Sequence, residues 1–309
     1  MSSRSDPRVV LHPAQGRTIE IAFGALGGIV LDTPSVDAVA AALDGAEILV
    51  SYPWRDEFLT PSLRWVQSVS AGTEQFPAER LREAGVALTS ARGIHGPQVA
   101  EHALALLLAM TRGVGRAALD RRDRVWKSPP VTEIGGMTMG VIGLGVIGEA
   151  VAERAKALGM RVVGTKRDIT GYRGAADRVV PAESMDEVFA EADVVVITLP
   201  GGAATRGIVG AAQMEALAGG WLINVGRGSV IDEAALAAAL AGGVLQGAGL
   251  DVFETEPLPG SSPLWDLPNL VMTPHVAGAS PHYGDRLADL FVRNLAAYRG
   301  DGDWINRVV

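Results

Sequence analysis

Short apolar runs alternate with longer helical segments through most of the chain, most regularly from Met139 onward. The run Val194-Val195-Val196-Ile197 has no polar alternation, which is typical of a strand covered on both faces. Ala- and Leu-rich stretches of helical length separate these runs, and this order predicts βαβ units and a parallel sheet. We therefore expect strands at residues 139–142, 161–164, 193–199, 221–225, 245–252 and 270–273, and helices at 146–158, 184–191, 210–218 and 232–241.

A second and weaker α/β series comes earlier in the chain. We expect its strands at residues 19–23, 47–51, 63–69 and 86–89, and a helix at 36–43. A long helix is predicted from 97 to 126, because apolar residues recur there at helical spacing and Pro97 suits a first turn. A final helix at 284–299 is expected to return to the N-terminal domain, which makes that smaller domain discontinuous.

Composition narrows the class of protein. Of 309 residues, 48% are apolar and 20% charged, which is ample for buried cores. The formal charge of -8 argues against a nucleic-acid partner, and the absence of cysteine excludes disulfides, thiolate metal sites and a cysteine nucleophile. The apolar runs at 9–11 and 103–110 are too short for a signal peptide or a membrane span. We expect a cytoplasmic protein with no membrane partner and no metal site.

A G-x-G-x-x-G element, Gly143-Leu144-Gly145-Val146-Ile147-Gly148, follows a predicted strand and opens a predicted helix. Gly143 suits a tight turn, Gly145 allows close approach of a pyrophosphate, and Gly148 allows helix and strand to pack closely. The N–H groups of the helix N-terminus would face the phosphates. The alternative is a glycine-rich turn that binds nothing, but strand, helix and second strand are in register, which favours a dinucleotide-binding domain of the Rossmann type.

The second strand of this unit ends in Thr165-Lys166-Arg167. An NAD enzyme usually has an acidic residue near this position, where it bonds the ribose 2′-hydroxyl. Lys166 and Arg167 would instead attract a 2′-phosphate, so NADP is favoured over NAD. The alternative is a solvated basic pair, followed by Asp168 in part of the NAD role.

Three further segments resemble the D-isomer-specific 2-hydroxyacid dehydrogenase family, in its glyoxylate/hydroxypyruvate reductase-like, NADP-preferring branch. They are Asn224-Val225-Gly226-Arg227-Gly228, Leu250-Asp251-Val252-Phe253-Glu254-Thr255-Glu256-Pro257 and Thr273-Pro274-His275-Val276-Ala277-Gly278. With Leu199-Pro200 and Thr205-Arg206-Gly207, the resemblance covers about residues 99–280, and more loosely 68–72 and 294–309. It implies a doubly wound cofactor domain at 96–281, and a flavodoxin-like α/β substrate domain formed by 1–95 and 282–309.

The resemblance implies three catalytic residues. Arg227 would hold the substrate carboxylate and polarise the ketone, since its fork of N–H donors matches a carboxylate. His275 would protonate the ketone oxygen and act as the base in reverse. Glu256 would bond the other imidazole nitrogen and favour the imidazolium; Glu254 is the alternative, but the family pattern points to the glutamate before proline. Taken singly, each of these residue types is more often a surface or structural group.

The remaining site residues are also implied by the resemblance. Asp251 would bond the nicotinamide carboxamide, with local capping of its own loop as the alternative. His102 is expected to be a packing or interface residue. Substrate contacts are expected from the backbone of Ala71 and Gly72 and from Tyr52, in addition to Arg227. Further cofactor contacts are expected from Leu199, Pro200, Val225, Gly226 and Gly278.

The function predicted from the sequence is hydride transfer between NADP(H), or alternatively NAD(H), and a small 2-keto acid/D-2-hydroxy acid pair. Two alternatives are a formate- or phosphite-type dehydrogenase of the same fold and a non-enzymatic nucleotide-sensing corepressor. The apolar long helix favours a homodimer. The residues leave the physiological 2-keto acid open.

Overall fold

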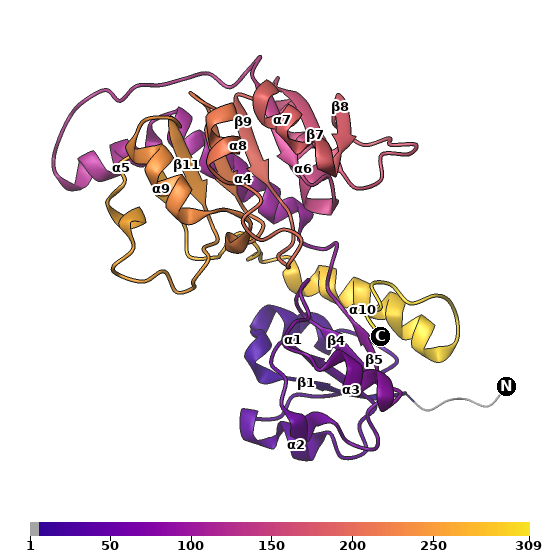
Figure 1. Cartoon of the computed structure of the whole chain (residues 1–309). Helices are drawn as coiled ribbons and strands as arrows, with labels where there is room; N and C mark the ends of the chain where they lie inside the picture. The colour runs from indigo at the N-terminus through magenta and orange to yellow at the C-terminus, as the bar shows by residue number, and fades with distance from the viewer. Residues whose placement is uncertain (1–5) are drawn as a thin grey trace. The chain divides into compact units, whose positions relative to one another are not determined.

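A computed structural model describes residues 6–309 and shows two compact units joined by two crossings of the chain (Figure 1). The central unit is His95–Ala279. The terminal unit combines the chain up to Ile94 with Ser280–Val309. The boundaries expected from the sequence, after residues 95 and 281, lie one and two residues from these positions.

The central unit contains a seven-stranded parallel sheet in the order β12-β11-β10-β9-β6-β7-β8. Chain order reverses between β6 and β9, so this is a doubly wound sheet with its switch point at that pair. Six strands were expected from the apolar runs, and β8, which has the sequence RVVP, was missed. The strands are β6 (Thr138–Ile142), β7 (Arg161–Lys166), β8 (Arg178–Pro181), β9 (Val194–Ile197), β10 (Trp221–Asn224), β11 (Gly247–Leu250) and β12 (Leu270–Met272).

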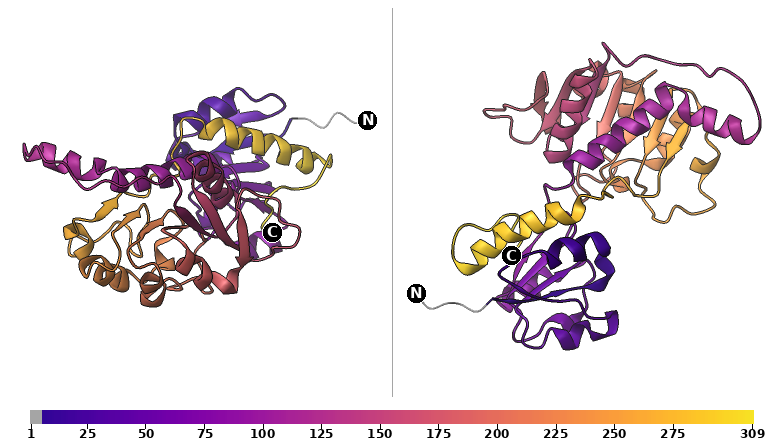
Figure 2. Two further views of the ribbon diagram at one scale, coloured as in Figure 1. Left: turned by 90° about the horizontal axis from the view of Figure 1, so that it is seen from above. Right: turned by 180° about the vertical axis from the view of Figure 1, so that it is seen from behind.

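Helices cover both faces of this sheet (Figures 1 and 2). Two of them, α4 (Gly96–Thr111) and α6 (Val146–Ala157), bury apolar residues in the core of one face. The opposite core contains residues of α7 (Met185–Glu191), α8 (Ala211–Ala216) and α9 (Glu233–Ala241). Because both faces are dry, β9 is buried along its whole length, as its unbroken apolar sequence predicts.

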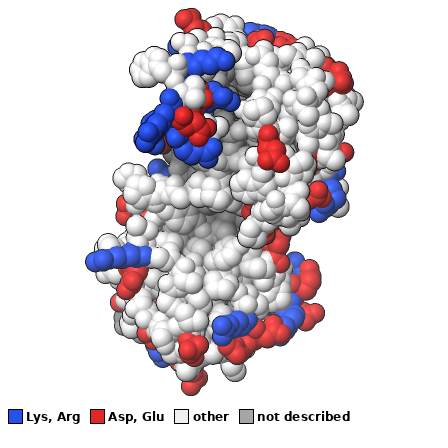
Figure 3. Space-filling view, turned by 90° about the vertical axis from the view of Figure 1, so that its left-hand side faces the viewer, with Lys and Arg blue, Asp and Glu red and all other residues white. Residues whose placement is uncertain are grey.

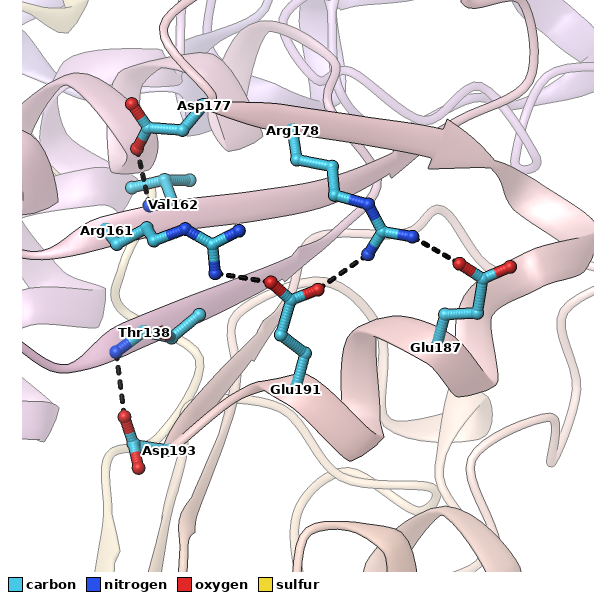
Figure 4. Close-up of polar contacts among 8 residues, drawn as sticks. All are labelled: Thr138, Arg161, Val162, Asp177, Arg178, Glu187, Glu191 and Asp193. Atoms are coloured by element: carbon cyan, nitrogen blue, oxygen red, sulfur yellow. Dashed lines mark hydrogen bonds and ion pairs between the residues drawn. The ribbon is translucent and has the colours of Figure 1, made fainter.

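Charged side chains tie the β7–β8 edge of the sheet to α7 (Figure 4). Glu191 at the end of α7 accepts from Arg161 and from Arg178, the latter at 2.6 Å, and Arg178 also pairs with Glu187. The hydrogen bond from Arg161 holds the pKa of the Glu191 carboxyl below its usual value, and Arg178 acts in the same direction. This edge is therefore held by a network rather than by isolated pairs.

The terminal unit contains a five-stranded parallel sheet in the order β2-β1-β3-β4-β5, the flavodoxin-like order. One face is covered by α1 (Arg17–Gly24) and α10 (Tyr283–Arg299), and the other by α2 (Val39–Ala42) and α3 (Ala78–Glu83). The strands are β1 (Arg8–Leu11), β2 (Val30–Asp32), β3 (Ile48–Ser51), β4 (Trp65–Ser68) and β5 (Ala87–Thr89).

The C-terminal segment completes the terminal core. The ring of Phe291 on α10 stacks on that of Trp65 in β4, with centroids 4.7 Å apart. Beyond α10, Val308 donates its N–H to the Leu88 carbonyl oxygen, so the tail pairs with β5. The expected final helix is therefore present and is integral to the smaller unit.

The strand expected at 19–23 is wrong, because these residues form α1. Ile19, Ala22 and Phe23 are buried at helical spacing, while Ile21 is 63% exposed. The alternation of apolar and polar residues in Ile-Glu-Ile fits a strand as well as a short helix, so it does not separate the two. The strand that fills this place in the sheet is β1, whose Val9, Val10 and Leu11 are fully buried or nearly so.

The single long helix expected at 97–126 is also wrong. It ends at Thr111, and α5 (Val114–Arg122) starts after Gly113, which has a left-handed φ of 66°. An added Cβ at Gly113 would lie 2.4 Å from Cγ of Pro129, so a side chain does not fit at this break. None of the helices described for residues 6–309 combines the length and apolar character that crossing a lipid bilayer requires.

Candidate active site

The glycine-rich element lies at the carboxyl end of β6, beside the switch point where open α/β sheets bind ligands. Gly143 has a left-handed φ of 106°, and Gly145 precedes the first residue of α6. A Cβ on Gly148 would lie 2.3 Å from the Gly143 carbonyl oxygen, whereas one on Gly145 would meet nothing within 4 Å. The loop thus packs tightly at Gly148 and leaves open space at Gly145, which fits the approach of a phosphate.

Neighbouring residues hold this loop in shape. The Gly143 N–H donates to Thr165 Oγ1 at 3.0 Å, and Thr198 Oγ1 donates to the Gly143 carbonyl at 2.7 Å. Leu199 packs against Gly143 from the end of β9, and its Cδ2 lies 2.9 Å from the position of an added Cβ. Leu144 is buried, and Val146 and Ile147 begin α6. Thr165 and Leu199, both expected near the cofactor, therefore contact the loop itself.

The basic pair expected to select the cofactor lies at the end of β7. Lys166 Nζ donates to the Leu144 carbonyl at 2.6 Å, which holds its charge beside the glycine-rich loop, and Arg167 is exposed. Asp168 accepts from the Thr170 N–H at 2.9 Å, and this bond keeps the pKa of the Asp168 carboxyl below its usual value. The local charge nearest the loop is positive.

Arg227 follows β10 in a loop with almost no spare volume. At Gly226 an added Cβ would lie 2.6 Å from the Leu199 carbonyl oxygen. At Gly228 it would lie 1.8 Å from the Phe253 carbonyl carbon. Buried Asn224 braces the turn from within, bonding the Gly226 N–H and the Arg227 carbonyl, each at 3.0 Å. The glycines on both sides of Arg227 are therefore steric requirements.

His275 and Glu256, distant in sequence, form a direct pair. The His275 Nδ1 and the Glu256 Oε2 are 2.6 Å apart, and Glu256 Oε1 accepts from the Phe253 N–H at 2.9 Å. His275 has a left-handed φ of 53°, which costs about 1–3 kcal/mol for a residue with a side chain. A strained backbone and an anchored carboxylate together fix the direction of the imidazole.

Glu254 has other partners. Its carboxylate pairs with Arg206 at 3.0 Å, and its N–H donates to the side chain of Glu233. Burial raises the pKa of the Glu233 carboxyl, and the charges of Glu254 and Glu256 raise it further. The structure thus brings Glu256, and not Glu254, to His275, while Glu233 was not expected here.

Buried Asp251 organises the loop that carries His275. Its carboxylate accepts from the N–H groups of Val276 and Ala277, each at 2.9 Å, and from the hydroxyl of Thr273 at 2.6 Å. The Thr273 hydroxyl also contacts His102 Nε2 at 2.8 Å. Asp251 therefore caps its own loop, the alternative considered from the sequence, and contact with the nicotinamide stays a prediction. His102 lies in this network rather than in plain packing.

Arg227 and His275 share one edge of one sheet. They follow β10 and β12, which flank β11, so at normal strand spacing their backbones lie about 10 Å apart. The contact of Gly228 with Phe253 joins the two loops. An apolar pocket of about 560 Å³ lies next to the His275–Glu256 pair, with Leu258, Trp265 and Met272 in its lining.

The remaining residues expected in the site lie in ordinary loop positions. Val225 is buried directly after β10. The Pro200 carbonyl accepts from Thr205 Oγ1 at 2.7 Å, and the Gly278 carbonyl accepts from Gln98 at 3.3 Å. No group of three or more His, Cys, Asp or Glu suited to a metal occurs within residues 6–309.

The residues expected to bind substrate lie in the terminal unit, at the carboxyl ends of β3 and β4. Tyr52 is 55% exposed just after β3. Ala71 is exposed, and the Gly72 carbonyl accepts from Ser70 Oγ at 2.5 Å. Trp54, two residues after Tyr52, packs its ring on Phe58 and Phe76. Substrate contacts of Tyr52, Ala71 and Gly72 stay predictions.

Comparison with known proteins addresses the family. Residues 104–277 match the family model described as D-isomer specific 2-hydroxyacid dehydrogenase, NAD binding domain. The chain is 38% identical over 246 residues to glyoxylate/hydroxypyruvate reductase B of Pectobacterium carotovorum, covering 77% of this chain and 76% of the relative. The chain belongs to the D-isomer specific 2-hydroxyacid dehydrogenase family.

Other proteins similar to this chain differ in length and in the activity that their names give. This chain is 38% identical over 267 residues to D-3-phosphoglycerate dehydrogenase of Mycobacterium bovis. The matched region covers 83% of this chain but only 50% of that relative. The chain thus spans about half the length of these first relatives. The crystal structure of an NADPH-dependent glyoxylate/hydroxypyruvate reductase from Sinorhizobium meliloti, in complex with NADP and malonate, has 30% identity and a TM-score of 0.78, covering 99% and 97% of the chains.

Sequence reasoning assigned no contact near the catalytic loops to His102, Thr273 or Glu233. Their contacts join segments that lie far apart along the chain, such as 171 residues for His102 and Thr273. The motif Thr273-Pro274-His275 contained one clue, because a threonine two positions before a histidine can face the same side of a strand end. Nothing in the sequence pointed to Glu233, which reads simply as the first residue of a helix capped by Asp232.

Proposed function

We propose that this chain is an NADP(H)-dependent reductase of small 2-keto acids that forms D-2-hydroxy acids, with NAD(H) as a possible second cofactor. The observation that carries the proposal is the His275–Glu256 pair, 2.6 Å apart, on the same sheet edge as the Arg227 loop and the glycine-rich turn. A guanidinium can hold the carboxylate of a 2-keto acid, and an imidazole bonded to a carboxylate can protonate its ketone oxygen. A formate-type reaction has no ketone oxygen to protonate.

Each of the three proposed catalytic residues has its own task in the reaction. A bound nicotinamide supplies or accepts the hydride. Arg227 holds the substrate carboxylate through its N–H donors and draws electron density from the adjacent ketone. His275 gives a proton to the ketone oxygen and takes it back in the reverse direction. Glu256 keeps Nδ1 occupied, so that Nε2 is the nitrogen available to the substrate.

Two observations support NADP(H) over NAD(H). The residues at the end of β7 are Lys166 and exposed Arg167, and no acidic residue stands in the ribose position. The nearest carboxylate, Asp168, is engaged with Thr170. The Sinorhizobium relative, at 30% identity, is NADPH-dependent by name. We also propose a cytoplasmic location for the enzyme, the location expected from its sequence.

The decisive experiment is a panel of 2-keto acids offered with NADPH or NADH. Glyoxylate, hydroxypyruvate, pyruvate and a branched 2-keto acid would be followed by loss of nicotinamide absorbance, with formate and phosphite tested with the oxidised cofactors. We expect reduction of at least one 2-keto acid, faster with NADPH, and a D-configured product. Turnover of formate or phosphite alone would overturn the proposal. No turnover of any compound, with the cofactor nevertheless bound, would favour the corepressor.

We also propose that the enzyme is a homodimer that uses the segment of residues 114–131. Its exposed apolar side chains include Val114, Leu119, Val125 and Val131, and Trp126 is completely exposed. Lys and Arg side chains gather around this helix where α5 faces the viewer (Figure 3). A fully exposed tryptophan is unusual on a monomer surface. A second copy of the same chain is the commonest partner in soluble oligomers, so we infer that it covers this segment.

A further inference from the structure

A pocket of about 510 Å³ lies at the amino edge of the terminal sheet. Its lining includes Glu47 and Arg64, which directly precede β3 and β4, and Trp304 and Arg307 from the C-terminal segment. Ala71 and Gly72 follow the other end of β4. Open α/β sheets bind their substrates at the carboxyl ends of the strands, so this pocket lies on the edge that the proposed reaction does not use.

Positive charge dominates the lining. Among the lining residues, Arg64, Arg299 and Arg307 outnumber one carboxylate, that of Glu47, and Arg299 is already paired with Asp6 outside the lining. Glu47 already accepts from the Tyr298 hydroxyl at 2.9 Å, which restrains it. Within residues 6–309, neither Arg64 nor Arg307 forms an ion pair with a side-chain carboxylate.

The arginines are held by backbone oxygens. Arg64 Nη1 donates to the carbonyls of Pro61 and Leu63 at 2.7 and 2.8 Å, and Arg307 Nε donates to the Val309 oxygen at 2.8 Å. These bonds use a fraction of the five N–H donors that each guanidinium carries. The side chains are thus oriented while further donors stay available to a ligand.

The aromatic wall of the pocket is also fixed. Trp304 meets buried Trp65 edge-to-face, with centroids 5.2 Å apart, and the Arg307 guanidinium lies over the Trp304 ring at 5.8 Å. The bridge between Arg307 and Thr89 attaches this segment to β5. A guanidinium stacked on a ring keeps its charge and presents its edge, so Arg307 is ready to bond an anion without reordering.

We propose that this pocket binds a small oxyanion with two or more negative charges, a phosphate or a polycarboxylate, through Arg64 and Arg307. Arg299, which already bonds Asp6 and the Gly28 carbonyl, adds positive charge to the lining. A guanidinium fork matches either oxyanion with paired hydrogen bonds. A competing explanation is that the arginines only neutralise the carbonyl ends of α3 and α10, which reach this edge. The two explanations differ in whether an added anion binds here saturably.

The test uses the full chain labelled with 5-fluorotryptophan, whose six signals include Trp304. The Trp304 signal is assigned by Trp304→Phe, and inorganic phosphate and citrate are titrated separately at constant ionic strength. We expect a saturable shift of the Trp304 signal with at least one anion and no shift of the signal of exposed Trp126. The anion that binds more tightly identifies the class of ligand.

Arg64→Gln and Arg307→Gln should each weaken this binding by about tenfold or more, since a hydrogen-bonded charge is lost. Arg82→Gln removes the same charge from a surface pair with Glu79 and should leave binding unchanged. The Trp65 signal reports whether each variant keeps its core. Absence of a saturable Trp304 shift with both anions, or an equal shift in all three variants, would overturn the proposal. Reduction of 2-keto acids is measured separately and should be unaffected in all three, so this result does not depend on the proposed function.

Discussion

Two glutamates in one loop have different partners, and only one of them contacts the proposed proton donor, His275. Glu256 bonds His275 and the Phe253 N–H, whereas Glu254 pairs with Arg206. Glu256 therefore acts on the imidazole directly, and Glu254 fastens the outside of the loop. Substitution of each by its amide separates these roles, because the change in shape is small.

Replacement of His275 by alanine should remove most of the turnover. General acid catalysis contributes about 10²- to 10⁴-fold, so kcat for 2-keto acid reduction should fall by that factor. The Kd for NADPH, measured by fluorescence titration, should change by no more than about twofold, since one side chain outside the phosphate loop is lost. Glu256→Gln should lower kcat as well, and Glu254→Gln should not. Unchanged turnover in His275→Ala would refute the assigned role.

The double substitution Lys166→Asp with Arg167→Ala should shift cofactor preference toward NAD. A carboxylate at the end of β7 repels a 2′-phosphate and can bond a ribose hydroxyl. The ratio of kcat/KM for NADPH to that for NADH should fall by about a hundredfold, equivalent to two factors of ten at about 1.4 kcal/mol each. Arg82→Asp with Arg80→Ala changes the charge equally in the terminal unit and should leave the ratio intact. Identical ratios in both double variants would exclude a role for the basic pair.

At this scale, the sequence predicts residues that carry motifs and misses residues that act through contacts. Arg227, Glu256 and His275 could be proposed as catalytic because each lies in a recognisable run of neighbours. The contact of His102 with Thr273 could not be found, since it depends on where α4 packs against the sheet. The left-handed backbone of His275 was equally hidden, because glycine, not histidine, is the usual occupant of such a conformation.

At the scale of elements, the βα unit at β6 and α6 combines a steric and a functional demand on its glycines. Gly148 has no room for a methyl group, and Gly145 has open space around it. The same substitution should therefore affect stability at Gly148 and cofactor binding at Gly145.

Gly148→Ala should lower the free energy of unfolding by about 2 kcal/mol or more, because the new methyl group overlaps a backbone oxygen. Gly145→Ala should change it by no more than about 0.5 kcal/mol. NADPH binding should nevertheless weaken in Gly145→Ala, since the added carbon projects where a phosphate would lie. Urea denaturation and cofactor titration measure the two effects. Equal stability of the variants would contradict the packing, and unimpaired binding in Gly145→Ala would contradict the phosphate site.

The network on α7 should make stability depend on pH. Because the pKa of Glu191 is lowered in the folded chain, its contribution is present above the unfolded pKa and is lost as pH falls through the folded value. Glu191→Gln should therefore cost about 1 kcal/mol at pH 7, as expected for a largely exposed network, and less near pH 3. Thermal unfolding at both pH values checks this, with exposed Glu215→Gln as the control. A cost that is the same at both pH values would rule out the ionic origin.

Element prediction succeeded where burial is complete and failed where a helix has one exposed face. β9 is apolar along its whole length, so its sequence admits few other structures, whereas β8, which begins with a charged residue and is only partly buried, was missed. The strand prediction at 19–23 was wrong because, over five residues, a short amphipathic helix and an edge strand can have the same pattern of apolar and polar residues. The break at Gly113 depends on contact with Pro129, sixteen positions further on, which local periodicity does not register.

On the scale of the whole molecule, the segment at 114–131 exposes several large apolar side chains, including the fully exposed Trp126. Replacing Val125 and Trp126 by serine should convert the proposed dimer into a monomer, because the exposed apolar area would be lost. Ile21 and Val30 are comparably exposed on the terminal unit, and their replacement by serine should leave the mass unchanged. Sedimentation velocity gives the molecular mass of each protein. A monomeric parent chain, or a dimer that survives the first double change, would defeat this assignment.

The discontinuity of the terminal unit has a consequence for how a ribosome delivers this protein. The aromatic core around Trp65 lacks Phe291 and the rest of α10 until synthesis has passed residue 299, long after residues 6–94. The central unit is encoded without interruption and can mature first, while the opening ninety or so residues wait with one apolar sheet face uncovered. A nascent chain stalled shortly before α10 should therefore bind chaperones strongly. Once residues 280–309 have also been synthesised and released, this binding should be lost.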